Sequence, residues 1–284
     1  MNWPYRWLDD AVYQARGSVS GNLVLSDGRP AAGASVFLGD NNSNLSTLDQ
    51  GAHYYYASTA DSHGHFNIKD VRSSTYGFYA WSNGRSIADV STTFALNNVT
   101  VRKGRETALG LLSWKTQGRK PIFQIGELDH KALGFRNGGA PYQHGLVANS
   151  PANLTYTIGQ SNESDWYFGQ SALGSWTILF DLTETDVAAN RSAVLSLSLA
   201  GYSRAVDLNV KINSQLLTSI TSNGLASDPG LYRSGTTAGE WRFLEFKIGA
   251  GKLKAGTNSL VFEVTRTTIW RGFMWDSVLL EWSS

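Results

Sequence analysis

A period of two between apolar and polar residues is the feature that most constrains the fold of this chain. In segment 206–212, valine, leucine or isoleucine occupies every second position, and aspartate, asparagine and lysine lie between them. In segment 195–199, leucines alternate with serines. Because successive side chains of a β-strand point to opposite faces of the sheet, both segments predict strands with one buried face. Helical patterns are nearly absent, apart from one turn at 184–189, so the sequence predicts an all-β protein.

Composition narrows the class further. The 29 glycines, together with 10 Trp, 12 Tyr and 12 Phe, are typical of β-sandwiches with tight turns. The near balance of 24 basic and 23 acidic residues argues against a nucleic-acid-binding protein. The absence of cysteine excludes disulfides, thiolate zinc sites and cysteine nucleophiles. No apolar run approaches the roughly 18 residues of a transmembrane helix, so we expect no membrane partner.

Turn signals and strand-like runs divide the chain into parts. Residues 1–16 are an entry segment, whose Trp3 and Trp7 we expect to dock on another surface. Residues 17–115 contain about seven short apolar runs between turns, a pattern that predicts a β-sandwich. A polar bridge at 115–120 precedes a second all-β unit at 121–284. At 284 residues, the chain is long enough for about two domains.

Evidence on the compartment comes from the N-terminus and from glycosylation sequons. No apolar stretch follows a basic start, so the N-terminus does not read as a signal peptide. Six Asn-x-Ser/Thr sequons in a cysteine-free, turn-rich chain favour a secreted glycoprotein over a cytosolic protein with chance sequons. The candidate glycosylation sites are Asn41, Asn44, Asn98, Asn153, Asn162 and Asn190.

The segment GSVSG at 17–21 satisfies the G-x-S-x-G pattern of a hydrolase nucleophile elbow. That motif requires a strand before the serine and a helix after it. Here the apolar run Leu23-Val24-Leu25 follows and predicts a strand, so we interpret the motif as a chance match.

His63 and His65 lie on one face if their segment is a strand. A metal site needs further ligands, for which Asp61 and His53 are the nearest candidates. Because no recognised ligand spacing is present, we favour a turn residue and a sheet-surface residue over a metal site.

Four carboxylates, on Glu127, Asp129, Asp276 and Glu281, lie near the ends of the second unit. Oxygen ligands of this kind suit a structural calcium ion between the terminal strands of a sandwich. No dense Asp/Asn/Gly loop accompanies them, so ordinary surface charge is the favoured interpretation. We therefore expect no cofactor, with structural calcium as the alternative.

Several aromatic and arginine residues lie in or beside predicted loops of the second unit. Aromatic faces stack on the C–H surfaces of sugars, and guanidinium groups bind carboxylates through paired hydrogen bonds. The adjacent Trp270 and Arg271 therefore suit an acidic sugar, whereas Trp241 and Trp275 are predicted to be core residues of their strands. The candidate carbohydrate-binding residues are Arg204, Asn213, Arg233, Trp270 and Arg271.

An ordered set of motifs resembles the C-terminal part of fungal-type rhamnogalacturonan endolyases of polysaccharide lyase family 4. The first unit is similar to the fibronectin-III-like middle domain of the family, a sandwich also found in carboxypeptidase-regulatory-like modules. The second resembles the third domain, a carbohydrate-binding-module-like jelly roll of the galactose-binding-like type. The first unit carries WPYRW at 3–7, RGSVSGNL at 16–23, DGRP at 27–30, ASVFL at 34–38, GHF at 64–66 and YGFYAW at 76–81; the second carries IFQIGELD at 122–129, LGFRN at 133–137, LTYTIG at 154–159, DWY at 165–167, VKIN at 210–213, YR at 232–233, GTN at 256–258 and MWDSVLLE at 274–281.

This resemblance implies a secreted protein of pectin degradation. Family members cleave the rhamnose–galacturonate backbone by β-elimination, with a lysine and a histidine supplied by a large N-terminal β-sandwich. No residue here matches that catalytic motif, so we expect this chain to be inactive alone. The implied partners are the pectic polysaccharide rhamnogalacturonan and a missing N-terminal catalytic domain.

Three hypotheses follow from these observations. The first is a non-catalytic accessory fragment that binds rhamnogalacturonan. The second is a polysaccharide lyase active in its own right, with chemistry around His130, His144 or Arg136. The third is a purely structural pair of domains that brace another domain through Trp3 and Trp7.

Overall fold

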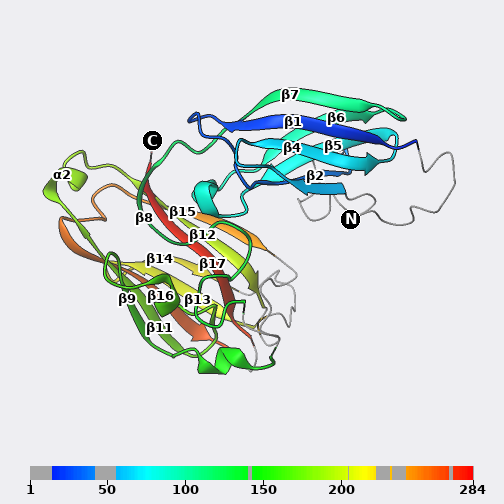
Figure 1. Cartoon of the computed structure of the whole chain (residues 1–284). Coiled ribbons are helices and arrows are strands. Elements are labelled where there is room, and N and C mark those ends of the chain that lie inside the picture. The colour runs from blue at the N-terminus through cyan, green and yellow to red at the C-terminus, as the bar shows by residue number, and fades with distance from the viewer. Residues whose placement is uncertain are drawn as a thin grey trace. The chain divides into compact units, whose positions relative to one another are not determined.

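The computed structural model describes residues 15–41, 56–139, 143–203, 205–221, 231, 241–268 and 271–283. The chain divides into two compact units, Met1–Gly118 and Arg119–Ser284 (Figure 1). Among the described residues, regular structure is almost entirely β-strand, which confirms the all-β class. No helix in these ranges is long and apolar enough to cross a membrane.

Unit 1 (Met1–Gly118) packs two sheets face to face. One sheet has the strand order β4-β1-β7 and the other β3-β2-β5-β6. β1 pairs in parallel with β7 and antiparallel with β4. The strands are β1 (Gly17–Leu25), β2 (Ser35–Gly39), β3 (Tyr56–Thr59), β4 (His65–Val71), β5 (Ser74–Trp81), β6 (Phe94–Val101) and β7 (Glu106–Trp114).

The core of unit 1 lies between these sheets. Phe66 of β4 and Phe78 of β5 stack with ring centroids 4.8 Å apart, which joins one sheet to the other. On β4 the apolar side chains are buried and the polar ones between them are exposed, as expected for a half-buried strand. Trp114, at the end of β7, is buried with its indole N–H donating to Thr92.

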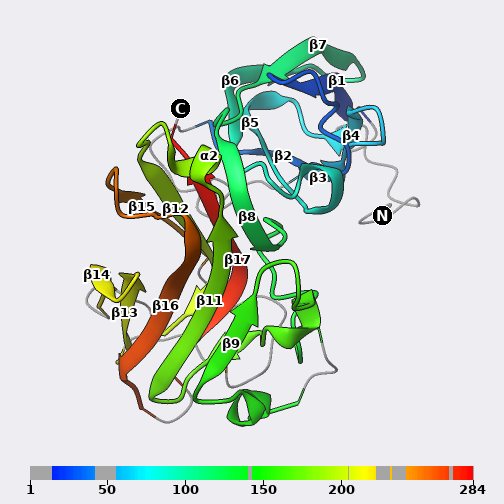
Figure 2. The same ribbon diagram turned by 90° about the vertical axis from the view of Figure 1, so that its left-hand side faces the viewer.

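Unit 2 (Arg119–Ser284) also contains two sheets, seen edge-on in Figure 1 and turned toward the viewer in Figure 2. One has the order β10-β17-β12-β15, with β8 also paired to β17, and the other β14-β13-β16-β11-β9. The strands are β8 (Lys120–Gly126), β9 (Leu154–Thr157), β10 (Gly169–Gln170), β11 (Gly174–Leu182), β12 (Ala193–Tyr202), β13 (Asp207–Ile212), β14 (Gln215–Ile220), β15 (Arg242–Ile248), β16 (Gly256–Arg266) and β17 (Phe273–Trp282). The short helical elements are η2 (Arg85–Ile87) in unit 1, and η3 (Leu146–Asn149), η4 (Glu163–Asp165) and α2 (Glu184–Val187) in unit 2.

An aromatic cluster fills the centre of unit 2. The ring of Trp166 lies 5.0 Å from that of Trp176 on β11 and 5.7 Å from that of Trp275 on β17, centroid to centroid. All three side chains are fully buried. Because β11 and β17 belong to different sheets, this cluster holds the two layers together.

The two strands predicted from alternation and the one predicted helical turn are all present in the structure. The segment 206–212 contains β13, the segment 195–199 lies in β12, and 184–189 contains α2. The strand expected at 52–56 lies outside the described residues except for Tyr56, where β3 begins.

Candidate functional site

A pair of buried carboxyl groups forms the most unusual polar cluster of unit 2. Asp276 lies on β17 and is 0% exposed, while Asp129 follows β8 and is 8% exposed. The backbone N–H groups of Asp129 and Lys131 each donate to Oδ1 of Asp276 at 3.2 Å. The Ser198 hydroxyl donates to the other Asp276 oxygen. The backbone N–H of Lys131 donates to Asp129 Oδ1 at 2.9 Å, and its Nζ lies 3.5 Å from Asp129 Oδ2.

Burial changes the acidity of this pair. It raises the pKa of Asp276 well above its ordinary value, despite the Ser198 hydrogen bond, and the Asp129 charge adds to the rise. Burial also raises the pKa of Asp129, against the opposing effect of Lys131. Two adjacent carboxyls share protons as one unit, so the pair binds a proton at a higher pH than exposed aspartates do.

Trp241 and His130 extend this cluster. The Trp241 indole N–H donates to the Ser198 hydroxyl at 2.8 Å, and the His130 ring stacks on the indole with centroids 4.0 Å apart. Burial, with the Lys131 charge as a second cause, lowers the pKa of His130 to about 4, so this imidazole is neutral at neutral pH. The prediction that Trp241 is a core residue is wrong: it is half-buried and held by a polar contact, whereas Trp275 is a core residue as predicted.

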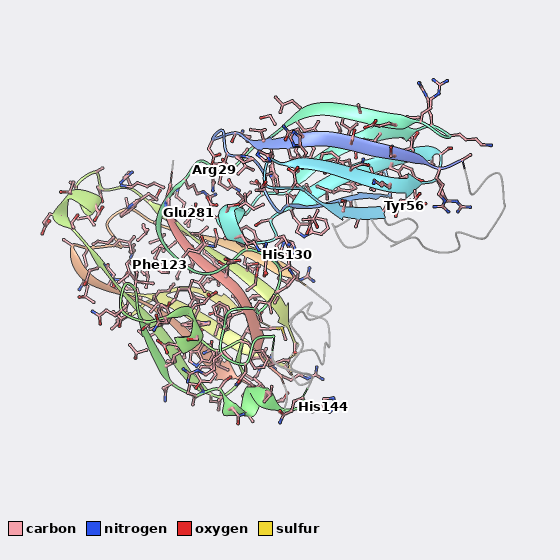
Figure 3. All side chains as sticks on the ribbon, viewed as in Figure 1. Arg29, Tyr56, Phe123, His130, His144 and Glu281 are labelled. Atoms are coloured by element: carbon pink, nitrogen blue, oxygen red, sulfur yellow. The ribbon has the colours of Figure 1, made fainter. Side chains whose placement is uncertain are left out.

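Arg119 organises a second set of charges on the same sheet. Its NH1 lies 2.5 Å from Glu245 Oε1 on β15 and 3.5 Å from Glu281 Oε2 on β17. The Ser196 hydroxyl donates to the same Glu245 oxygen at 3.3 Å. Figure 3 shows Glu281 at the opposite end of β17 from the helical segment beside His144. Glu281 therefore belongs to an ion-pair network of its own.

The calcium alternative can be judged on these contacts. Of the four carboxylates considered from the sequence, Asp129 and Asp276 share hydrogen bonds, and Glu281 pairs with Arg119. Glu127 is exposed; burial raises the pKa of Glu163, and the charges of Glu127 and Asp129 add to that rise. Calcium takes about six to eight oxygen ligands, whereas the oxygens of this pair already accept hydrogen bonds. The pair does not fit a calcium site.

We expect Asp276→Asn to flatten the pH dependence of the stability of unit 2. Because the folded-state pKa of Asp276 is raised, the native state binds more protons than the unfolded state between about pH 4 and the raised pKa. Stability is therefore lost as pH rises through that window, by at most about 1.4 kcal/mol per pH unit for one proton. His130, with its lowered pKa, contributes with the opposite sign, but both proteins contain it, so it cancels in the difference.

The check is urea denaturation of parent and Asp276→Asn across the acidic to neutral range. Asp181→Asn, which changes an exposed carboxylate of the same unit, should keep the parental pH profile. If the free energy of unfolding of the parent and of Asp276→Asn changed with pH in the same way, the raised pKa of Asp276 would be contradicted.

The structure separates the two described candidates for carbohydrate binding. Along the β13–β16 pair, Asp207 lies opposite Arg266 at one end and Ile212 opposite Leu260 at the other. Asn213 follows Ile212, whereas Arg271 follows the Arg266 end, so they lie at opposite ends of the sheet. The remaining candidates, Arg204, Arg233 and Trp270, lie outside the described residues.

Asn213 is committed to a turn. Its φ of 47° places it in the left-handed region between β13 and β14. Its Nδ2 donates to the Lys252 carbonyl at 2.9 Å and to Asn258 Oδ1 at 2.8 Å, and its Oδ1 accepts from the Ser259 N–H at 3.0 Å. These bonds use its amide for folding and leave Arg271 as the better placed ligand-binding candidate.

Arg271 lies in the connection between β16 and β17. Its backbone carbonyl accepts from the Ser171 hydroxyl at 2.6 Å, and its N–H donates to the Thr268 carbonyl at 3.1 Å. Gly272 follows, and a Cβ there would lie 2.3 Å from the Gln170 carbonyl, so the backbone of Gly272 lies in close contact with Gln170. The guanidinium group forms no hydrogen bond or ion pair with the described residues.

The residues of the lyase hypothesis are not brought together. His130 stacks on Trp241, and Figure 3 shows His144 at the far end of unit 2. Arg136 donates to the Ser164 carbonyl at 3.0 Å, and its guanidinium carbon lies 5.1 Å from the centre of the Tyr167 ring.

The two motifs of the first unit are also located. Ser18 and Ser20 lie inside β1, so GSVSG forms no strand-to-helix turn and is no nucleophile elbow. His63 occupies the turn after β3 and His65 begins β4, both exposed, while His53 lies outside the described residues.

The described sequon asparagines are all exposed. Asn41 and Asn98 hydrogen-bond to each other at 2.8 Å, Asn153 accepts from the Ser175 N–H, and Asn162 caps η4. Asn190 follows α2 with a φ of 46°, and Asn44 lies outside the described residues. Glycosylation at these positions stays a prediction.

Comparison with known proteins places both units in one family. A model described as polysaccharide lyase family 4, domain II, matches residues 15–109, and one described as domain III of the same family matches residues 121–280. The models represent a fibronectin-type-III-like and a carbohydrate-binding-module-like domain, which agrees with the expected pair of sandwiches.

Curated relatives agree with this match. A rhamnogalacturonate lyase of Dickeya dadantii is 30% identical, and the alignment covers 98% of this chain and 46% of that protein. A probable rhamnogalacturonate lyase B of Aspergillus niger is 27% identical, and the alignment covers 67% of this chain and 30% of that protein. A rhamnogalacturonate lyase A of Aspergillus aculeatus is 26% identical, and the alignment covers 77% of this chain and 41% of that protein. The chain thus spans less than half the length of these relatives. The models of domains II and III of polysaccharide lyase family 4 match this chain in order, so the chain belongs to that family.

Proposed function

We propose that this chain is a non-catalytic, carbohydrate-binding part of an extracellular rhamnogalacturonan lyase that degrades pectin by β-elimination. The observation that carries the proposal is the consecutive match of domains II and III across nearly the whole chain. An accessory domain that binds the polysaccharide keeps a linked catalytic domain near its substrate and raises the effective concentration. Catalysis in the whole protein is then assigned to a separate domain.

The burial of Asp276, whose pKa is raised well above its ordinary value, supports a non-catalytic role for this group. A general base must come within hydrogen-bonding reach of the proton that it removes. Asp276 is 0% exposed and receives hydrogen bonds from Ser198 and two backbone N–H groups, so it cannot meet a polysaccharide. We therefore assign the carboxyl pair to the structure of unit 2.

Arg271 is the described residue best suited to bind a pectic ligand. Galacturonate carries a carboxylate at neutral pH, and a guanidinium group binds a carboxylate through two parallel hydrogen bonds. The exposed Thr268 lies in the same connection, and its hydroxyl is able to bond a sugar hydroxyl, whereas the Thr267 hydroxyl donates to the carbonyls of Thr268 and Arg271. Because an open sugar site buries little area, the affinity should be modest.

Arg271→Ala should weaken binding of rhamnogalacturonan oligosaccharides by about tenfold or more, the typical value of a charge-assisted hydrogen bond. Arg271→Lys should retain part of the affinity, because it keeps the charge but not the paired geometry. The matched control is Arg191→Ala, which removes an arginine that stacks on Trp282 elsewhere in unit 2.

Affinity would be measured by calorimetry, with thermal unfolding as a check on folding. Equal affinity of the parent and a folded Arg271→Ala variant would remove Arg271 from the site. Loss of binding in Arg191→Ala as well would show that the effect is one of net charge alone.

A further inference from the structure

We propose that the turn between β3 and β4 binds a divalent transition-metal ion of the zinc type through the carboxylate of Asp61 and the imidazoles of His63 and His65. This turn, residues 61–65, is called the histidine turn below. The site belongs to unit 1 and is independent of the carbohydrate-binding proposal for unit 2.

The three side chains already converge. Each offers one ligand atom, and these atoms all lie within 4.8 Å of one another. Oδ2 of Asp61 is 3.5 Å from Nδ1 of His65, and the two imidazole centroids are 6.1 Å apart with an interplanar angle of 33°. Bonds of about 2.0–2.1 Å place the ligands of a tetrahedral zinc ion roughly 3.3 Å apart. Oδ2 of Asp61 and Nδ1 of His65 already lie close to that spacing, and both imidazoles are exposed.

The backbone holds the carboxylate in position. Oδ1 of Asp61 accepts hydrogen bonds from the N–H groups of His63, at 2.8 Å, and of His65, at 2.9 Å. Gly64 has a φ of 83°, and a Cβ there would lie 2.2 Å from the Leu23 carbonyl, which restricts the turn to this conformation. The backbone of the turn and the Asp61 carboxylate are therefore preformed.

A purely structural role explains only part of the histidine turn. The backbone hydrogen bonds of the turn use Oδ1 of Asp61, and Gly64 supplies the left-handed conformation. Outside this backbone frame, Oδ2 of Asp61 faces Nδ1 of His65 at 3.5 Å, and Nδ1 of His63 lies 3.2 Å from the Ser62 hydroxyl. Two exposed histidines beside an ionised carboxylate match the nitrogen and oxygen ligands that zinc, nickel and copper prefer. Calcium, which prefers about six to eight oxygen ligands, does not suit this set.

Because of the position of the histidine turn, a bound metal ion would stabilise the fold of unit 1. β3 belongs to the β3-β2-β5-β6 sheet and β4 to the β4-β1-β7 sheet, so the histidine turn joins the two layers of unit 1. A metal ion bound there fixes the connection between the layers and stabilises the folded state by mass action. At a free zinc concentration of about 100 times Kd, the unfolding temperature of unit 1 should rise by about 10 °C.

The test is calorimetric titration of the untagged full chain with Zn²⁺, and separately with Ca²⁺. We expect one Zn²⁺ per chain at this turn and no Ca²⁺. His63→Ala and His65→Ala should each weaken Zn²⁺ binding by at least about 10–100-fold, the loss found even for the outer partners of metal ligands. Line broadening of the His63 and His65 imidazole NMR signals by Cu²⁺ gives a second readout.

Two matched variants separate ligation from folding. Asp61→Asn keeps an oxygen for the two backbone N–H groups but loses the charged ligand, so it should fold normally and bind Zn²⁺ weakly. His144→Ala removes an exposed histidine of unit 2 and should leave Zn²⁺ binding unchanged. Parental affinity in the His63→Ala, His65→Ala double variant, or no Zn²⁺ binding by the parent, would overturn the proposal.

Discussion

Gly126→Ala should lower the free energy of unfolding of unit 2 by about 2–5 kcal/mol. Gly126 ends β8 with a φ of 75°, a conformation that costs an L-residue about 1–2 kcal/mol. An added Cβ would lie 2.2 Å from the Asp276 carbonyl and 2.6 Å from the Phe135 ring. Overpacking of this kind costs about 1–3 kcal/mol, which adds to the conformational cost. The substitution also shifts the backbone just before Asp129, and so disturbs the hydrogen bond from the Asp129 N–H to Asp276.

Urea denaturation of the two proteins measures this effect. Gly159→Ala is the matched control, because Gly159 has a φ of 80° in the same unit and an added Cβ there would meet nothing within 4 Å. It should lose only the conformational part, about 1–2 kcal/mol. Equal losses for the two variants would show that the contact between Gly126 and β17 is not tight.

Trp166→Ala should destabilise unit 2 by about 3–5 kcal/mol, the usual range for removing a buried aromatic side chain. Trp166 is 0% exposed and packs edge-on against Trp176 and Trp275, which lie on different sheets. Its removal therefore leaves a cavity between the layers, and the surrounding rings can fill that cavity only in part.

The comparison variant is Trp166→Phe, which keeps an aromatic ring between the layers and should lose clearly less stability. Both variants would be measured by urea denaturation, with the far-ultraviolet spectrum as a check of strand content. A loss below about 1 kcal/mol for Trp166→Ala would mean that the cluster is not the joint between the sheets.

Alternation along the chain predicts β13 and β12 well, because burial of one strand face is a local property of the sequence. On β13 the residues alternate strictly between buried and half-buried. On β12 the leucines lie in the core, but Ser196 and Ser198 of the other face are buried too, at 1% and 0% exposure. Alternation shows which face is apolar, but not whether the polar face is covered by other groups.

The polar cluster of unit 2 depends on contacts that the sequence order hides. The Asp129 N–H and the Asp276 carboxylate are 147 positions apart, and only the pairing of β8 with β17 brings them together. The position of Trp241 is mispredicted for the same reason, since its indole N–H is satisfied by Ser198 on the neighbouring strand. Asn213 and Arg271 share the chemistry of sugar contacts, but the β13–β16 register places them at opposite ends.

In the histidine turn, by contrast, the residues that come together are also close in the sequence. Its three candidate ligands are within five positions, so the sequence already suggests them. The sequence does not show the left-handed bend at Gly64, which places the His65 N–H within hydrogen-bonding distance of Asp61.

The central claim, that this chain binds a pectic polysaccharide without cleaving it, is tested most directly by one titration. Rhamnogalacturonan oligosaccharides would be added to the purified chain in a calorimeter, and the ultraviolet absorbance of unsaturated uronate product would be followed in the same samples. Our account predicts heat of binding that saturates at up to about millimolar sugar, with no product. Formation of product would contradict the non-catalytic assignment, and the absence of both heat and product would contradict carbohydrate binding and favour domains that only brace another.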